Sequence, residues 1–198
     1  SQTVNMLLEA RAVGIHYYSA SISSLDNEEN TKNNRKTFSV EVFNEQTNIA
    51  IISEISHPDI GALKKAIETN KQRKVSILDI KKDIIQISDY QLVICYQPNK
   101  NFNSIFNEIK SKKINYLVIT GPNTQWSFLN EVQANYSKTT IDQTENFSAQ
   151  FNKGFTAFGQ KDIGFIDFPP LQDQFGSLKI LGKQDAILNQ FIAGFKTQ

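Results

Sequence analysis

Short apolar stretches alternate with segments of helical periodicity through the middle of the chain. Four of these stretches, at residues 48–53, 74–78, 90–96 and 115–120, are rich in β-branched residues. Near-continuous apolar runs of this length are typical of strands that are covered on both faces, as in parallel sheets. The pattern therefore predicts an α/β fold in which a parallel sheet carries helices on both sides.

Three helices are predicted between and after these strands. The first begins at Pro58–Asp59, since proline suits the first helical turn and aspartate is favourable near the positive end of a helix. The second repeats apolar residues at i, i+3, i+4 and i+7 from Phe102 to Ile109, and the third begins after Thr124, a possible N-cap. The lysines between residues 64 and 74 are interpreted as the solvated face of the first helix.

Residues 1–46 have a different hydrophobic pattern, which predicts strands at 3–10, 16–22 and 37–43 without helices between them. The last of them alternates apolar Phe38, Val40 and Val42 with polar residues, which predicts a strand with one apolar face. A polar stretch at 26–36 joins the second and third strands. Because three antiparallel strands of this kind cannot close a core of their own, residues 1–46 are predicted to be part of a larger module.

Aromatic residues dominate beyond Asn135, where the pattern is weaker. The spacing of phenylalanines between Phe147 and Phe158 is nearly helical, but the three-residue loop Asn152–Gly154 between two short alternating runs favours a hairpin. Residues 162–176 are predicted to be an irregular loop, because paired prolines cannot lie in a central strand. Residues 187–195 fit either a last strand or a short helix.

Composition excludes several classes of function. Lys and Arg number 21 against 20 Asp and Glu, a net charge of +1 that provides no field to attract nucleic acid. No apolar run approaches the roughly 20 residues of a membrane span, and no signal peptide is recognisable. The single cysteine, Cys95, lies within an apolar strand and is predicted to be a core residue. Since the chain starts at Ser1 in what looks like the middle of a strand, we interpret it as part of a longer protein.

Polar residues follow the predicted strands at the edge where α/β proteins bind ligands. In a doubly wound sheet this site lies outside the carboxyl ends of the strands. The candidate binding residues at that edge are His57, Asp59, Gln97, Asn99 and Asn123. The same residue types also serve as helix caps and turn residues, which is the alternative interpretation of each of them.

The motifs of several chemistries are missing from this edge. There is no G-x-x-x-x-G-K-[ST] phosphate loop and no G-x-G-x-x-G turn, so nucleotide cofactors are not expected. The turn Gly121–Asn123 offers neither a cysteine nor a glycine-flanked serine, and His16 is far from His57 in the sequence, so no nucleophile and base are paired. No H-x-x-x-H or D-x-D spacing supports a metal site. We therefore expect no enzyme activity, no cofactor and no metal.

Two family resemblances are carried by stretches of this sequence. Residues 14–22, the Asn-rich stretch 30–34 and Phe38–Val42 resemble the closing strands of bacterial immunoglobulin-like adhesion modules. Residues 49–53, 57–65, 89–94, 96–99 and Phe168–Leu171 resemble the region that follows the von Willebrand factor A domain in membrane-anchored proteins of the Bacteroidetes. Together the two resemblances cover most of the chain.

The second resemblance implies the fold of class I glutamine amidotransferases, a flavodoxin-like three-layer α/β/α sandwich. It would comprise residues 47–198 and continue past Gln198, while residues 1–46 would be a partial immunoglobulin-like sandwich. Amidotransferase activity in that family requires a G-x-C-x-G elbow and a downstream His-x-Glu pair. Neither is present, so the resemblance does not carry the catalytic role to this chain.

The function that the resemblance implies is a non-catalytic interaction or scaffold region on the periplasmic side of a membrane-anchored parent. Protein partners are expected, with membrane attachment only through parent segments outside this chain. The alternative is a small-molecule-binding or weakly hydrolytic domain that uses the strand-end cleft. A deep pocket lined by His57, Asp59, Gln97 and Asn123 would favour the alternative, and a shallow edge would favour the scaffold. A homodimer formed through residues 1–46 is also expected, because their apolar face would otherwise be uncovered.

Overall fold

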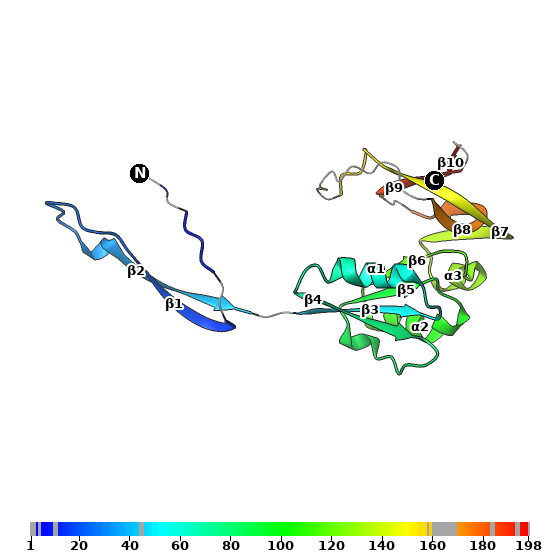
Figure 1. Ribbon diagram of the computed structural model, residues 1–198, viewed down its shortest axis with the longest axis horizontal. Helices are drawn as coiled ribbons and strands as arrows, with labels where there is room; N and C mark the ends of the chain where they lie inside the picture. Colours follow the sequence, from blue (N-terminus) through cyan, green and yellow to red (C-terminus); the bar gives the residue numbers. More distant parts are fainter. Residues whose placement is uncertain are drawn as a thin grey trace. The chain divides into compact units, whose positions relative to one another are not determined.

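The computed structural model of this protein describes residues 3, 5–9, 12–43, 46–157, 159, 170–182, 185–192 and 195–197. The chain divides into two compact units, Ser1–Gln46 and Thr47–Gln198. Figure 1 shows an antiparallel hairpin in the first unit, and a parallel sheet with helices followed by antiparallel strands in the second.

The first unit contains a two-stranded antiparallel sheet. Strand β1 (Gly14–Ser21) pairs with β2 (Arg35–Val42), and a short 3-10 helix, Lys32–Asn34, precedes β2. Tyr18 lies opposite Phe38, and their rings stack with centroids 5.7 Å apart. The strand predicted at 3–10 is wrong for residues 3 and 5–9, which have no regular secondary structure. A strand needs a hydrogen-bonded neighbour, and β1 takes β2 as its partner instead.

The second unit is built on a four-stranded parallel sheet. Its strands are β3 (Thr47–Ser53), β4 (Arg73–Asp79), β5 (Leu92–Tyr96) and β6 (Tyr116–Ile119), in the order β4-β3-β5-β6. All neighbouring pairs are parallel. The predicted α/β class and the four predicted strands are therefore confirmed.

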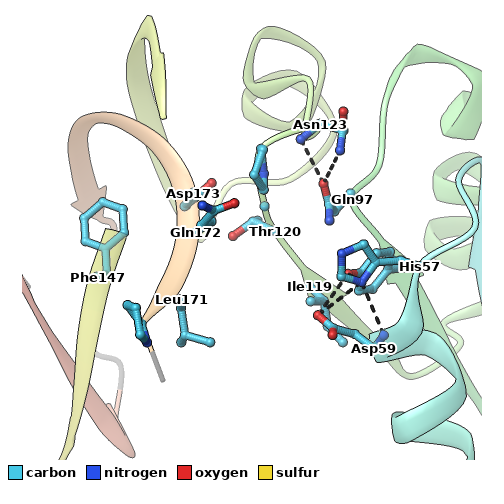
Figure 2. Close-up of a pocket in the computed structure, with 14 residues that line it drawn as sticks. His57, Asp59, Gln97, Ile119, Thr120, Asn123, Phe147, Leu171, Gln172 and Asp173 are labelled. Carbon is cyan, nitrogen blue, oxygen red and sulfur yellow. Dashed lines mark hydrogen bonds and ion pairs between the residues drawn. The ribbon is translucent and has the colours of Figure 1, made fainter. Parts of the chain in front are cut away.

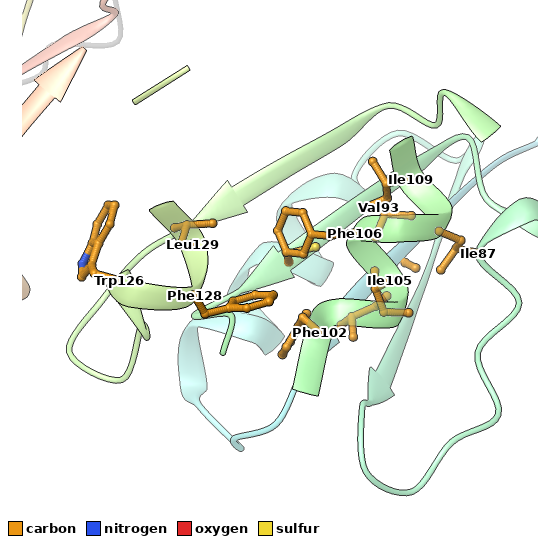
Figure 3. Close-up of a cluster of buried hydrophobic side chains, with 12 residues drawn as sticks. Ile87, Val93, Phe102, Ile105, Phe106, Ile109, Trp126, Phe128 and Leu129 are labelled. Carbon is orange, nitrogen blue, oxygen red and sulfur yellow. The ribbon is translucent and has the colours of Figure 1, made fainter. Parts of the chain in front are cut away.

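Helices cover both faces of this sheet, because alternate strand residues point to opposite sides. Helix α1 (Pro58–Ile67) packs through Ile60 on the face of Ile49 and Ile51. Helices α2 (Asn103–Lys112) and α3 (Trp126–Val132) pack on the other face. Figure 3 shows this larger core, which contains Ala50, Ile52, Ile87, Val93, Cys95, Phe102, Ile105, Phe106, Ile109, Trp126, Phe128 and Leu129. Burial of Cys95, as predicted, is confirmed.

The residues at the starts of α1 and α3 have identifiable structural roles. Pro58 is the first residue of α1, as predicted, and His57 is its N-cap. The N-cap of α3 is Gln125 and not Thr124, so that prediction is wrong. The Thr124 hydroxyl instead accepts a hydrogen bond from the Gly121 backbone N–H at 2.9 Å, which closes the turn after β6. Among the described residues, no helix has the length and apolar character needed to span a bilayer.

An antiparallel sheet follows α3. The long strand β7 (Tyr136–Phe151) pairs with β8 (Leu171–Ile180) along most of its length and with β9 (Leu188–Ile192) at its end. Strand β10 (Phe195–Thr197) completes the order β10-β9-β7-β8. The antiparallel partners of β7 are therefore distant in sequence.

Two predictions for this part need correction, and one question that the sequence left open is answered. A turn does close at Asn152, whose carbonyl accepts from Phe155, but residues 155–157 and 159 form no strand, so the predicted hairpin is wrong. The predicted loop at 162–176 is wrong for residues 171–176, which belong to β8, whereas 162–169 lie outside the described residues. Pro170 precedes the strand and therefore does not interrupt it. Residues 188–192, which the sequence left open between strand and helix, form β9.

Candidate functional site

The carboxyl ends of β5 and β6 face the beginning of β8 across a cavity of about 690 Å³. Figure 2 shows its two walls, one from the parallel sheet and one from the β7–β8 pair. The lining residues are His57, Asp59, Tyr96, Gln97, Ile119, Thr120, Gly121, Pro122, Asn123, Phe147, Pro170, Leu171, Gln172 and Asp173. Four of the five candidate binding residues therefore meet at one cavity: His57, Asp59, Gln97 and Asn123.

On the first wall, His57, Asp59 and Tyr96 form one hydrogen-bonded group. The backbone N–H of Asp59 donates to Nδ1 of His57 at 3.3 Å, and this bond caps α1. The Tyr96 hydroxyl lies 3.0 Å from the same Nδ1 and donates to Oδ2 of Asp59 at 3.3 Å. Because a backbone N–H can only donate, Nδ1 accepts the hydrogen bond from the Asp59 backbone, and Oδ2 of Asp59 lies 3.4 Å from the same nitrogen. Burial raises the pKa of Tyr96, so the phenol keeps its proton at neutral pH.

Gln97 is a buried polar residue held in an uncommon conformation. Its φ of 48° is in the left-handed region, and its backbone N–H donates to the Ile119 carbonyl at 2.7 Å. Its side-chain Oε1 accepts from the backbone N–H of Asn123 at 2.8 Å and from Asn123 Nδ2 at 3.1 Å. Gly121 makes room for this side chain, since a Cβ there would lie 2.7 Å from Cδ of Gln97.

The opposite wall is positioned by β8. Nε2 of Gln174 donates to the carbonyls of Pro122 at 2.8 Å and Thr124 at 2.9 Å, which ties β8 to the turn after β6. Phe147 of β7 and Leu171 of β8 provide the apolar part of this wall. The local sequence pattern did not point to these residues, because only the long-range pairing of β7 with β8 brings them to the strand ends.

A buried ion pair lies behind this wall. Lys138 Nζ donates to Oδ2 of Asp173 at 2.8 Å, and the lysine side chain is 6% exposed. The ammonium also lies 5.4 Å from the ring centroid of Trp126 and 5.5 Å from that of Phe147. Contacts of this kind are attractive, because the ring faces carry partial negative charge. The charge of Asp173 is therefore compensated before any ligand arrives.

Asn99, the fifth candidate, lies outside this cavity. Its Nδ2 donates to Oε2 of Glu54 at 2.6 Å, and Asn101 Nδ2 donates to the same oxygen at 2.7 Å. Lys81 pairs with the other oxygen of Glu54 at 2.5 Å. This Glu54 clamp joins the loops that follow β3, β4 and β5. The loops after β3 and β5 are thus bonded to each other. The cavity lies farther along the same edge of the sheet, beside β6.

The polar side chains described at the cavity offer hydrogen-bond donors and acceptors. Cys95, the only thiol, is buried among the residues of the α2–α3 core, and burial raises its pKa to about 12. His16 belongs to β1 in the first unit. Within the described ranges, no three His, Cys, Asp or Glu side chains gather as metal ligands would. The arrangement is therefore suited to holding a ligand.

Comparisons of the chain with models of protein families, with curated proteins and with solved structures find no match.

Proposed function

We propose that residues 47–198 form a non-catalytic domain that binds a small molecule in the cavity between β5, β6 and β8. The observation that carries this proposal is the convergence of His57, Asp59, Gln97 and Asn123 on one cavity of about 690 Å³. Ligand sites usually have volumes of about 300–1,000 Å³, with a few polar groups placed among apolar ones. Gln97 and Asn123 are fixed by each other, so the wall is formed before a ligand binds.

For the fold of this unit we propose the flavodoxin-like, class I glutamine amidotransferase-like sandwich. Numbered from β3, the parallel strands have the order 2-1-3-4, which agrees with the first four positions of the flavodoxin-like order 2-1-3-4-5. The turn Gly121–Asn123 has no thiol, which supports a role without glutamine hydrolysis. Ammonia release from glutamine should therefore remain at background. Release above background that disappears in Cys95→Ala would contradict the proposal.

A scaffold role for the first unit is the second candidate. It would be an immunoglobulin-like part of a membrane-anchored von Willebrand factor A-type protein, on the periplasmic side. Exposed apolar side chains on the hairpin favour contact with a protein partner: Tyr17 of β1 is 77% exposed and Ile15 is 57% exposed. Co-purification with the full-length parent, followed by identification of bound proteins, tests this role. Loss of a bound protein on deletion of residues 1–46 would support it, and unchanged binding would contradict it.

A fragment-binding experiment tests the small-molecule proposal. Amide NMR spectra recorded with a library of polar fragments should show shifts at residues 96–97, 119–123 and 171–173. The variant Gln97→Asn should weaken these shifts, because asparagine tolerates the positive φ but its shorter amide cannot reach Asn123 in the same way. Gln91→Asn is the matched control, since Gln91 bonds Asn48 before the amino end of β5. A library that moves none of the cavity amides would contradict the proposal.

A further inference from the structure

The Lys138–Asp173 ion pair differs in its burial from the other ion pairs of the described residues. Nζ of Lys138 lies 2.8 Å from Oδ2 of Asp173, and the two side chains are 6% and 13% exposed. In each of the other pairs at least one side chain is 41% exposed or more. Lys82 and Asp79, for example, are also 2.8 Å apart, but this lysine is 80% exposed. Of the described residues, only Lys138 and Asp173 thus hold an amine and a carboxyl group in contact away from bulk water.

Burial changes what this pair can gain by reacting. Taking two charges out of water costs free energy, and their mutual attraction does not always repay that cost. Nζ of Lys138 lies near the rings of Trp126 and Phe147, at 5.4 and 5.5 Å from their centroids, and rings replace only part of the hydration of an ammonium group. An amide between the two side chains would carry no charge, so the cost of burying two charges would disappear.

The amine is already in position to attack the carboxyl group. Reacting atoms are well placed when they lie about 3–3.5 Å apart with suitable orientation. A nitrogen 2.8 Å from one carboxylate oxygen is close to that distance from the carboxyl carbon, Cγ of Asp173. Pairing of β7 with β8 holds the two groups together. Asp173 also lines the cavity (Figure 2), so a water molecule released from it can leave through the cavity.

A second carboxylate lies in register with the pair. Glu145 of β7 is directly opposite Asp173 of β8. Side chains that are directly opposite in an antiparallel pair point to the same face, with Cβ atoms about 4.5–5.5 Å apart. Glu145 is half-buried, and its Oε1 accepts from the Asn146 backbone N–H at 3.2 Å. A carboxylate in this position can take a proton from the amine and deliver it to the departing oxygen.

We propose that Lys138 and Asp173 condense to an isopeptide bond, an amide that joins β7 to β8 covalently. Nζ forms a bond to Cγ of Asp173, and the bond from Cγ to one carboxylate oxygen breaks. The ammonium gives up two of its three hydrogens as protons, Glu145 passes them to the departing oxygen, and one water molecule leaves. The charges of the pair cancel, so the step needs no oxidant, cofactor or further reactant. The ion pair in the structure is the reactant state, and the bond is independent of what the cavity binds.

Intact-mass spectrometry of the full chain, denatured for the measurement, tests the bond. The protein should be lighter than its sequence by the mass of one water molecule, and a digest should contain a branched peptide that links residues 138 and 173. Lys138→Arg, which keeps the charge but has no amine to react, should have the full mass. Lys82→Arg is the matched control and should lose water as the wild type does. Glu145→Gln should slow formation of the bond about a hundredfold or more, because it removes the proton carrier.

Protein that is kept unfolded in urea should have the full mass and should lose water after refolding, because only the folded strands bring the two groups together. A wild type that retains its full mass after prolonged incubation in the folded state would overturn the proposal. A loss of water that persists in Lys138→Arg, or that maps to other residues, would also overturn it. Formation of the bond at the wild-type rate in Glu145→Gln would overturn the role of Glu145. Circular dichroism of each variant shows whether it has kept its fold.

Discussion

Glu54 joins three loops through one carboxylate. Hydrogen bonds from Lys81, Asn99 and Asn101, in order of their effect with Lys81 first, lower its pKa from 4.5 to about 2. These partners follow β4 and β5, whereas Glu54 follows β3. A single ionised side chain thus fixes the geometry of the strand ends beside the cavity. The interaction requires the charged form, and this makes it dependent on pH.

The Glu54 clamp should stabilise the second unit only while Glu54 is ionised. The folded pKa lies below the unfolded one, so this stability is complete above pH 4.5 and is lost as the pH falls towards about 2. The contribution should be about 1 kcal/mol, because Lys81 is more than half exposed and its charge is screened. Urea unfolding at pH 7, 4 and 2.5 should show a smaller loss in Glu54→Gln than in the wild type. Equal losses in both proteins would contradict this assignment.

Cys95 should react slowly with thiol reagents in the folded protein. Its side chain is fully buried in β5, and burial raises its pKa to about 12, so almost no thiolate is present at neutral pH. The rate of labelling should increase strongly when the protein is unfolded in urea. Rapid stoichiometric labelling under native conditions would show that the strand opens or is not covered on this face.

The roles of individual site residues were only partly predictable from the sequence. The positions of His57, Asp59, Gln97 and Asn123 follow from the rule that parallel strands end at one edge of the sheet. Asn99 follows the same strand as Gln97, and the rule could not tell that its amide bonds Glu54. Side-chain rotamers and loop conformations decide whether such a residue lines the cavity or bonds a neighbouring loop. Neither can be read from the local sequence.

At the level of elements, the pairing of β7 with β8 is the part of the fold that the local sequence determines least. The short runs around Asn152–Gly154 locally favour a hairpin, yet β7 pairs with β8, which begins 20 residues after β7 ends. Two sets of contacts stabilise this pairing. Lys138 of β7 bonds Asp173 of β8 and lies over Trp126 of α3. Gln174 of β8 donates to the turn after β6. Local signals predicted the parallel strands well because each of those is a self-contained apolar run. The antiparallel partners depend on contacts that a local pattern does not contain.

Two glycine substitutions should have opposite effects on stability. A Cβ at Gly176 would lie 2.1 Å from the Thr139 carbonyl oxygen, so Gly176→Ala must displace the backbone of β7. We expect a loss of about 2 kcal/mol or more, within the range of severe packing changes. Gly61 lies within α1 with no atom within 4 Å of a new Cβ, so Gly61→Ala should stabilise the protein by up to about 1 kcal/mol.

Denaturant unfolding of both glycine variants provides the measurement. A neutral Gly176→Ala would mean that β8 does not approach β7 as closely as the structure indicates. A destabilising Gly61→Ala would mean that another group packs against that side of α1.

For the whole molecule, the two units differ in how far their apolar side chains are covered by other parts of the same unit. The second has cores on both faces of its sheet, whereas the hairpin of the first has an apolar face with Tyr18, Phe38 and Val40, of which Phe38 remains 39% exposed. A two-stranded sheet alone is marginally stable in water. The change of hydrophobic pattern near residue 46 could be recognised in the sequence, but the absence of regular structure at residues 5–9 could not.

The chain should form a homodimer through its first unit. The apolar face of β1 and β2 would be covered by a second copy, by edge pairing or by packing of the two faces. Light scattering over a concentration series should show a dimer that Val40→Lys shifts to monomer. Ser39→Lys is the matched control, because Ser39 pairs with Tyr17 on the opposite face of the hairpin. A monomer at high concentration in the wild type would contradict the proposal.

Strand β3 begins at Thr47, at the junction with the first unit, and lies between β4 and β5 in the sheet. A pulling force transmitted along the chain from residues 1–46 would therefore reach the second unit at an inner strand. The hydrogen bonds of β3 to both neighbours would bear that force together, whereas a strand peeled from an edge loses its bonds one after another. Tension that enters at residue 47 would thus meet two ladders of hydrogen bonds, one on each side of β3.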